Sequence, residues 1–350
     1  MKEKVGAEVE RMLRAELEQL GLLGFLEDPG VTDIMVNPDG GLYVHDAEGR
    51  RGPLAELDGR VLGSLLQTVA AANGVVLNRE VPRLEGTLPM ARARVAATIP
   101  PLSEGPQLVL RIPARQMLEL EDLVENETLP RAAAELLEER LKARANCLIA
   151  GGMGSGKTTF LNALLQRILD EDPFHRLCIL EEGSRELHLE GSNLLRLLAD
   201  DASGNDVRAL VRLSLRMNAD RLVVGEARGA EAHDFVKACN TGTPGSLMTI
   251  HANSAEESVF RLDDCVMEAG VPSQLKRICS TVDLLVFMAR YGGQPRVMEI
   301  RRLVGVDAKG EPRTELLYEL DRRAASAGGG PSGRARAPRD DSAGQAEVLE

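Results

Sequence analysis

A glycine-rich segment at residues 151–158 constrains this chain more than any other feature. It reads Gly-Gly-Met-Gly-Ser-Gly-Lys-Thr, which fits the pattern of a glycine, four free positions and then Gly-Lys-Ser/Thr. The apolar residues 147–150 before it predict a buried strand, and residues 159–165 after it predict a helix. A strand, this loop and a helix in that order predict a binding site for a phosphate chain rather than a chance glycine-rich turn.

Each part of this segment has a chemical role. The glycines let backbone N–H groups point inward at phosphates, and the first turn of the helix adds the positive end of its dipole. Lys157 supplies a mobile charge to the outer phosphates, and the Thr158 hydroxyl is placed to ligate Mg²⁺. The sequence therefore predicts ATP and Mg²⁺ as ligands, with these ATP-binding residues: Gly151, Gly152, Met153, Gly154, Ser155, Gly156, Lys157, Thr158 and Thr159.

Composition narrows the class of protein. The 350 residues are enough for two domains, and 43% hydrophobic with 27% charged residues is typical of a soluble globular protein. A net charge of −12, six Phe, three Tyr and no Trp argue against a stable nucleic-acid binder. No apolar run is long enough to span a bilayer, and the N-terminus lacks the apolar core of a signal peptide. Five dispersed cysteines indicate reduced cytosolic thiols rather than a metal site.

The first part of the chain, residues 1–112, mixes helical and antiparallel-strand patterns. Apolar residues at helical spacing predict a helix over about 2–20, and a second helix is expected over 54–72. Strands are predicted at 33–37 and 42–45, which a Pro-Asp-Gly-Gly turn joins as a hairpin, and at 91–98 and 107–112. Residues 113–130 are predicted to be a linker with an acidic, solvated surface.

The second part, residues 131–323, alternates strands with helices. A helix over 131–145 leads into the first buried strand, and further strands are predicted at 178–180, 222–224, 247–250, 284–288, 296–300 and 315–320. This alternation predicts an α/β fold with a parallel-type sheet covered by helices on both faces. Residues 324–350 are rich in Ala, Gly, Ser, Pro and Arg, and are predicted to be a disordered tail.

Three predicted strands end in side chains that suit ATP hydrolysis. Glu226 ends one strand, the pair Glu181-Glu182 ends another, and His251 follows a third. The carboxyl ends of parallel strands meet near the phosphates, so Glu226 is expected to activate water and His251 to sense the γ-phosphate. One acid of the pair, Glu182 first, is a candidate for binding Mg²⁺ through water or orienting the nucleophile. The alternatives are solvated glutamates and a structural histidine.

Arginines complete the predicted site. Arg216, Arg221 and Arg228 lie around the strand that carries Glu226. A guanidinium neutralises phosphoryl charge either within one chain or across a subunit interface, so Arg216 and Arg228 are candidate arginine fingers. The alternative is that they are ordinary surface arginines.

Taken in order, these segments resemble the ATPases of the type II/type IV secretion superfamily. The resemblance covers about residues 110–290 and rests on the phosphate loop, the Glu181-Glu182 pair, residues 225–229 (Gly-Glu-Ala-Arg-Gly) and the segment around His251. Residues 240–246, Asn-Thr-Gly-Thr-Pro-Gly-Ser, are similar to the segment that precedes that histidine in the family. Residues 34–40, Ile-Met-Val-Asn-Pro-Asp-Gly, look like the TrbB-type conjugal-transfer branch, and the CpaF-type pilus-assembly branch is the close rival.

The resemblance implies a RecA-like ATPase domain that follows a smaller α+β, PAS-like domain. It implies a homohexameric ring with nucleotide between the two domains. The ring is expected at the cytoplasmic side of inner-membrane secretion or pilus machinery, with at most peripheral contact with the membrane. It assigns Lys157, Thr158, Glu226 and His251 to catalysis and nucleotide binding. Arg111 matches the arginine that precedes the family's linker and is expected to reach the nucleotide.

The chain also departs from the family's pattern. The family's acidic box usually ends Glu-Asp, whereas here Glu182 is followed by Gly-Ser-Arg before Glu186, which leaves the roles of Glu181 and Glu182 open. Residues 216–220 lack the family's usual proline, and the cysteine quartet of many type II secretion ATPases is absent. The leading hypothesis is an ATPase motor for secretion, conjugal transfer or pilus assembly. A nucleotide-dependent assembly switch and a DNA translocase or helicase are the alternatives.

Overall fold

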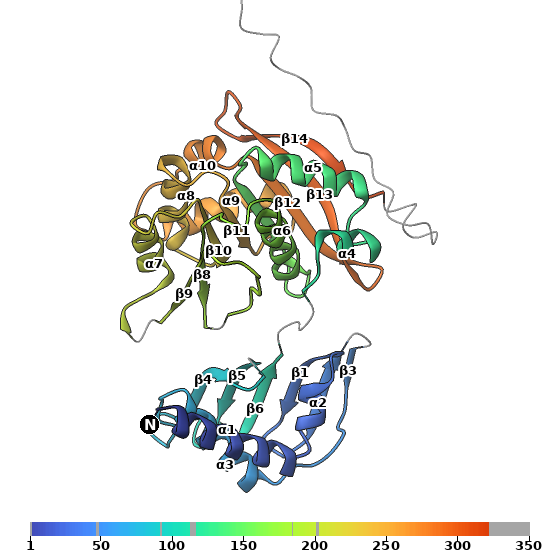
Figure 1. Cartoon of the computed structure of the whole chain (residues 1–350), viewed down its shortest axis with the longest axis vertical. Coiled ribbons are helices and arrows are strands. Elements are labelled where there is room, and N and C mark those ends of the chain that lie inside the picture. Colours follow the sequence, from blue (N-terminus) through green and yellow to red (C-terminus); the bar gives the residue numbers. More distant parts are fainter. Residues whose placement is uncertain are drawn as a thin grey trace, which may run out of the picture. The chain divides into compact units, whose positions relative to one another are not determined.

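The computed structural model describes residues 2–46, 49–91, 93–112, 117–183, 185–200 and 203–321, with the side chains of 2–7 left out. The chain forms two compact units, Met1–Gln116 with Gly183–Glu186, and Met117–Glu182 with Leu187–Glu350 (Figure 1). Each unit has its own hydrophobic core. The predicted disordered tail, residues 324–350, lies outside the described residues.

The first unit is a six-stranded antiparallel sheet with helices α1 and α3 packed against each other. The strand order is β3-β2-β1-β6-β5-β4. Its elements are α1 (Lys2–Gln19), α2 (Leu23–Glu27), β1 (Val31–Val36), β2 (Leu42–Asp46), β3 (Gly49–Arg51), α3 (Gly59–Ala72), β4 (Arg83–Leu88), β5 (Ala93–Thr98) and β6 (Gln107–Arg111). The predicted first helix and the β1–β2 hairpin are confirmed, and Val36 pairs with Leu42 at the turn.

Several elements of the first unit differ from the sequence prediction, and the short elements α2 and β3 were not predicted. The second helix begins at Gly59 rather than near residue 54, because the Asp58 side chain accepts a hydrogen bond from the Arg60 N–H at 2.7 Å and caps the helix there. The edge strand β4 was not predicted. Its sequence, Arg-Leu-Glu-Gly-Thr-Leu, contains Glu and Gly, which are depleted in strands, and few of the β-branched or aromatic residues that favour them.

The second unit is an eight-stranded mixed sheet in the order β14-β13-β12-β7-β11-β10-β8-β9. The six strands from β12 to β9 run parallel, and β13 and β14 are antiparallel. The strands are β7 (Cys147–Gly151), β8 (Leu177–Glu182), β9 (Leu194–Ala199), β10 (Arg221–Ala227), β11 (Leu247–Ile250), β12 (Leu284–Tyr291), β13 (Gln294–Val306) and β14 (Pro312–Glu319). The predicted α/β class is therefore confirmed.

Helices cover both faces of this sheet (Figure 1). They are α4 (Leu120–Glu125), α5 (Arg131–Lys142), α6 (Lys157–Glu171), α7 (Val207–Ser214), α8 (Glu231–Thr241), α9 (Ala255–Met267) and α10 (Leu275–Thr281). Successive residues of β7 alternate between two hydrophobic clusters: Cys147 and Ile149 belong to one, and Leu148 and Ala150 to the other. A strand buried on both faces explains the continuous apolar run before the phosphate loop.

Part of the predicted linker and one strand behave differently from the sequence prediction. Helix α4 lies within residues 113–130, and its Leu120 and Leu123 are buried in the core of the second unit. The acidic side chains of this stretch begin the helix, because the Glu119 N–H donates to Asp122 at 2.7 Å. Strand β9 reads Leu-Leu-Arg-Leu-Leu-Ala, which consists of helix-favouring residues, so the sequence did not predict it.

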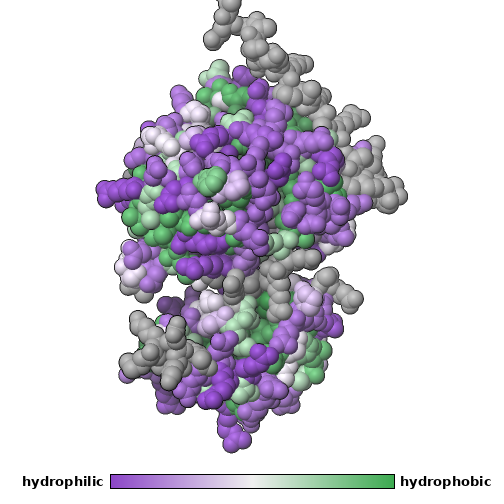
Figure 2. Space-filling model, viewed as in Figure 1, coloured by the Kyte–Doolittle hydropathy of each residue, from purple (hydrophilic) through white to green (hydrophobic). Residues whose placement is uncertain are grey.

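The visible face of each unit is covered mostly by hydrophilic residues, with apolar residues scattered among them (Figure 2). Most large apolar side chains are buried in the cores of the two units, although some, such as Phe174 and Met153, are exposed. In the part of the chain that the structure describes, no helix combines the length and the apolar character that crossing a bilayer requires.

Candidate nucleotide-binding site at the carboxyl edge of the parallel strands

The phosphate loop connects the end of β7 at Gly151 to the start of α6 at Lys157. Gly156, directly before the helix, has φ 89°, and a Cβ there would stand 2.9 Å from the Cβ of Pro295. Only glycine fits this position without strain. The Ser155 hydroxyl donates to the carbonyl of Gly152 at 2.9 Å and closes the loop. The free N–H groups at the start of α6 are thereby presented at the mouth of the loop.

Lys157 is folded back over this loop. Its Nζ donates to the carbonyls of Gly151 at 2.7 Å and Gly152 at 2.9 Å, and the residue is only 7% exposed. Burial lowers the pKa of Lys157, and the negative charge of Glu226 partly offsets this effect. The ammonium group is therefore held by neutral carbonyls, which a phosphate oxygen can replace as a stronger, charged acceptor.

Glu226 and His251 meet beside the loop. The strands β10 and β11 are parallel neighbours, and Ala227 pairs with Ile250, so the residues on either side of this pair lie at the same edge of the sheet. The His251 Nε2 lies 2.8 Å from Glu226 Oε1, and its Nδ1 lies 3.5 Å from Lys157 Nζ. The structure brings together the three side chains that the sequence predicted to converge at the phosphates.

Arg228 extends this group to a fourth strand end. Its Nε and Nη2 lie 2.7 Å and 2.6 Å from Glu226 Oε2, and its Nη1 lies 3.0 Å from Glu182 Oε2. Arg228 therefore bridges two carboxylates of its own chain. Lys157, His251, Glu226, Arg228 and Glu182 form one continuous line of polar contacts along the carboxyl edge, which we call the catalytic row.

The two acids at the end of β8 have different surroundings. Glu182 is 42% exposed and belongs to the catalytic row. Glu181 is 6% exposed, and its carboxylate accepts the backbone N–H of Leu187 at 2.8 Å. Glu181 therefore anchors the segment after β8, whereas Glu182 is the acid that faces the site.

Residues 81–291 match the family described as Type II/IV secretion system protein, which is more than half of the chain. The chain belongs to this family. It is 32% identical over 308 residues to the probable conjugal transfer protein TrbB of Sinorhizobium fredii, covering 87% of this chain and 93% of that protein. It is 34% identical over 301 residues to the conjugal transfer protein TrbB of Rhizobium radiobacter, covering 84% and 91%.

A solved structure agrees with the fold. The ATPase DotB of Legionella pneumophila has a TM-score of 0.57 at 20% identity, covering 82% of this chain and 80% of that one. At this identity the similarity shows the fold alone. The family match and the TrbB-type relatives confirm the type II/type IV secretion ATPase that the sequence predicted.

The remaining predicted arginines do not join the catalytic row. Arg221 lies on the strand that carries Glu226, as predicted, but it begins β10 and therefore stands at the opposite end of that strand from Glu226. Arg216 is exposed in the turn between α7 and β10. Arg111 lies on β6 of the first unit, where its Nε is 3.3 Å from Asp33 Oδ1.

Two features of the site had no signal in the sequence. Pro295, on β13, packs against Gly156 although the two are far apart along the chain. The double contact of Arg228 with Glu226 and Glu182 depends on side-chain conformation, which no spacing rule reveals. Ser254 caps α9 after His251: its hydroxyl accepts the Glu257 N–H at 3.0 Å, while the Glu257 carboxylate accepts from the Asn253 N–H at 3.2 Å.

Proposed function

We propose that the protein is a motor that hydrolyses Mg-ATP at the phosphate loop to power conjugal transfer or a related type IV secretion process. The observation that carries this proposal is the position of Glu226, 2.8 Å from His251 and at the same edge as Lys157. A carboxylate beside the phosphate loop is placed to act on a water molecule there. The TrbB-type relatives support conjugal transfer over pilus assembly as the process.

Different residues have different roles in the proposed hydrolysis. The loop N–H groups and Lys157, released from the carbonyls of Gly151 and Gly152, bind the phosphate oxygens and offset the charge that spreads over them. Glu226 orients the attacking water and accepts its proton. Water forms a new bond to the γ-phosphorus as the bond to the bridging oxygen of ADP breaks. His251 touches both Lys157 and Glu226, so it is placed to register whether the γ-phosphate is present.

Thr158 and Glu182 fit a Mg²⁺ ion held with the nucleotide. Thr158 is half-buried in the first turn of α6, and its hydroxyl makes no hydrogen bond within the described residues. Hydroxyl and carboxylate oxygens are ligands that Mg²⁺ accepts, with water and phosphate filling the other positions. When bound, the ion would neutralise phosphate charge, with Thr158 and Glu182 as the residues that would hold it. Glu182 would serve through water, because Arg228 already occupies one of its oxygens.

We further propose the finer architecture that the family resemblance implies. The second unit would be RecA-like, which the parallel order β12-β7-β11-β10-β8-β9 supports, and the first unit PAS-like. Six copies would form a cytoplasmic ring that docks on inner-membrane secretion machinery. Arg111, and Arg216 from a neighbouring copy, would contact phosphate in that ring. Arg228 would act within its own chain, since it contacts Glu226 there.

Steady-state phosphate release from the purified protein tests the proposal. We expect linear release over many turnovers that requires Mg²⁺ and is indifferent to added DNA. Release that stops after one turnover would contradict a motor and indicate an assembly switch, and strong stimulation by DNA that falls with salt would indicate a translocase. In the host, deleting the gene should abolish transfer, and a Lys157→Ala copy should fail to restore it.

A further inference from the structure

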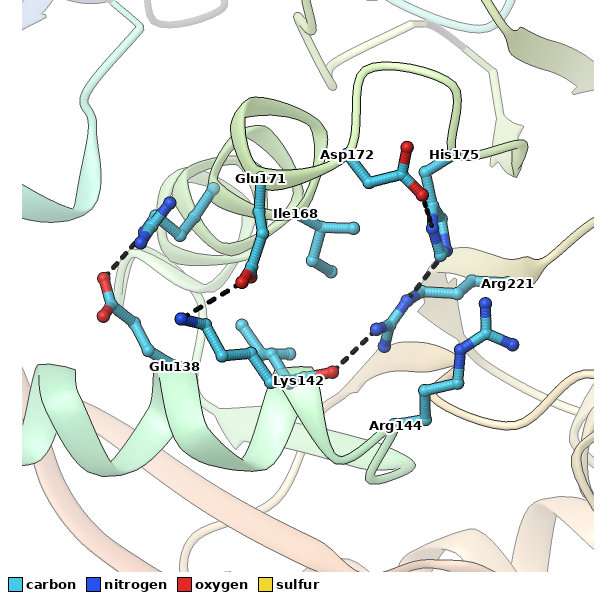
Figure 3. Close-up of a pocket in the computed structure, with 10 residues that line it drawn as sticks. Glu138, Lys142, Arg144, Ile168, Glu171, Asp172, His175 and Arg221 are labelled. Carbon is cyan, nitrogen blue, oxygen red and sulfur yellow. Dashed lines mark hydrogen bonds and ion pairs between the residues drawn. The ribbon is translucent and has the colours of Figure 1, made fainter.

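A second charged site lies at the amino edge of the same sheet, remote from the phosphate loop. It is a cavity of about 220 Å³ between the last turns of α5 and α6 and the first residue of β10 (Figure 3). Ten residues line it: Glu138, Leu141, Lys142, Arg144, Arg167, Ile168, Glu171, Asp172, His175 and Arg221. We call it the amino-edge cavity.

Arg221 is a buried cation whose hydrogen bonds within the described residues go to neutral acceptors, and the carboxylates of Asp220 and Glu171 act on it only through their charge. The residue is 4% exposed, and its guanidinium donates to the carbonyls of Leu141 at 2.7 Å and Gly245 at 2.8 Å and to His175 Nε2 at 3.1 Å. A guanidinium has five N–H donors, so two have no acceptor among the described residues. The carbonyl at the end of α5 offsets part of the charge. A buried charge that meets only neutral groups remains costly, and an anion would relieve that cost.

The fold is shaped to admit this side chain. Gly245 has φ 78°, and a Cβ at that position would collide with the Arg221 Nη1 atom. Burial, and next the positive charge of Arg144, lower the pKa of Arg221 to about 10. His175 accepts from Arg221 through Nε2, so its proton lies on Nδ1, 3.4 Å from Asp172. His175 is therefore neutral in this arrangement and supplies no counter-charge.

Two ion pairs hold four of the other charges around the cavity, while Asp172, which contacts neutral His175, and Arg144 lie outside these pairs. Glu138 contacts Arg167 at 2.7 Å, and Glu171 contacts Lys142 at 3.1 Å. Arg144 extends from the turn after α5 beside Arg221 (Figure 3) and is exposed, and its guanidinium has no hydrogen bond within the described residues. Four cationic and three anionic side chains line the cavity, which leaves one positive charge over.

We propose that the amino-edge cavity binds a small phosphate-bearing anion between Arg144 and Arg221. The free N–H groups of Arg221 would form the buried floor of the site, and Arg144 would close over the ligand from the solvent side. Two guanidinium forks suit the several oxygens of a phosphate group. A volume of about 220 Å³ exceeds that of a cavity known to hold benzene, so a phosphate with a small organic group fits.

Isothermal titration of inorganic phosphate into the full chain tests this site. The phosphate loop is first saturated with a non-hydrolysable Mg-ATP analogue, so that phosphate cannot enter it, and occupancy by the analogue is measured separately. We expect one phosphate to bind per chain. Arg144→Gln should weaken that binding about tenfold or more, because it removes one charged donor without touching the fold. Lys276→Gln, an exposed cation on α10, is the matched control and should bind like the wild type.

Three results would overturn the proposal. The first is the absence of phosphate binding once the loop is filled, and the second is an Arg144→Gln affinity equal to that of the wild type. The third is acetate binding as tightly as phosphate, which would show a carboxylate site rather than a phosphate site. A protein that fails to bind the ATP analogue contradicts the proposed function but leaves this test intact, because phosphate binding that depends on Arg144 is then measured alone.

Discussion

The two edges of the parallel sheet in the second unit hold cations in opposite ways. At the carboxyl edge, Lys157 rests on loop carbonyls but has the carboxylate of Glu226 nearby, and Arg228 bridges two acids. At the amino edge, Arg221 is more deeply buried and meets two carbonyls and a neutral histidine. Two elements connect the edges: α6 runs from the carboxyl edge to the amino edge, and β10 runs from the amino edge to the carboxyl edge.

The cations at the two edges are therefore expected to have different roles. Those at the carboxyl edge would take part in ATP hydrolysis, and Arg221 at the amino edge would bind a ligand. A cation next to carboxylates can exchange one anionic partner for another as phosphate arrives and leaves. A cation buried among neutral groups has no such partner to exchange, so it either stabilises the helix ends that it touches or binds an external anion. We therefore expect ATP turnover at the catalytic row and anion binding without turnover in the amino-edge cavity.

The largest effect is expected at the carboxyl edge, from Lys157→Ala. Loss of the ammonium group removes charge stabilisation from the transferred phosphoryl group, so phosphate release should fall about 100-fold or more, and nucleotide affinity should fall with it. Steady-state release and nucleotide titration measure the two effects. Lys276→Ala is the control and should match the wild type, and a Lys157→Ala protein that turns over normally would remove the loop from the mechanism.

An intermediate effect is expected from Arg228→Gln. The two carboxylates that Arg228 bridges would lose their shared cation, so Glu226 would be less firmly placed. The rate of phosphate release should therefore fall about tenfold, with ATP affinity nearly unchanged. Arg228→Lys keeps the charge but not the fork, and should recover only part of the rate. Steady-state kinetics, which give kcat and KM separately, measure this effect. An equal loss of affinity would show that Arg228 binds the nucleotide directly.

The smallest effect is expected at the amino edge, from His175→Gln. Burial, and then the charge of Arg221, lower the pKa of His175 below its ordinary value of 6.5. The unfolded chain then binds more protons than the folded one as pH falls below about 6.5, so the stability that neutral His175 contributes is present above that pH and is lost on acidification toward the folded pKa. Glutamine keeps an acceptor for Arg221 but does not titrate, so it should flatten this dependence.

Calorimetric unfolding of the second unit between pH 5 and pH 7 measures this effect, over the range in which an ordinary histidine titrates. The control is His45→Gln, an exposed histidine of the first unit, which should leave the transition of the second unit unchanged. An unchanged pH dependence in His175→Gln would mean that the charge on His175 is not linked to folding.

The sequence predicted the carboxyl edge better than the amino edge, for physical reasons. The phosphate loop is encoded in eight consecutive residues, and strand ends that share an edge place Glu226 and His251 together. The same reasoning does not bring Arg221 to that edge. It stands five residues before Glu226, and an extended strand separates such residues by about 16 Å, which puts them at opposite ends. The amino-edge cavity forms from helix ends and a turn that are distant in sequence, so no local pattern indicates it.

Phosphate release by Glu226→Gln, at a Mg-ATP concentration shown by titration to fill the site, tests the central claim most directly. The amide keeps the shape of the side chain but cannot accept the proton of the attacking water. The account predicts that Mg-ATP binds as in the wild type while turnover falls about 100-fold or more. Turnover at the wild-type rate would contradict the assignment of Glu226 and, with it, the motor proposed for the carboxyl edge.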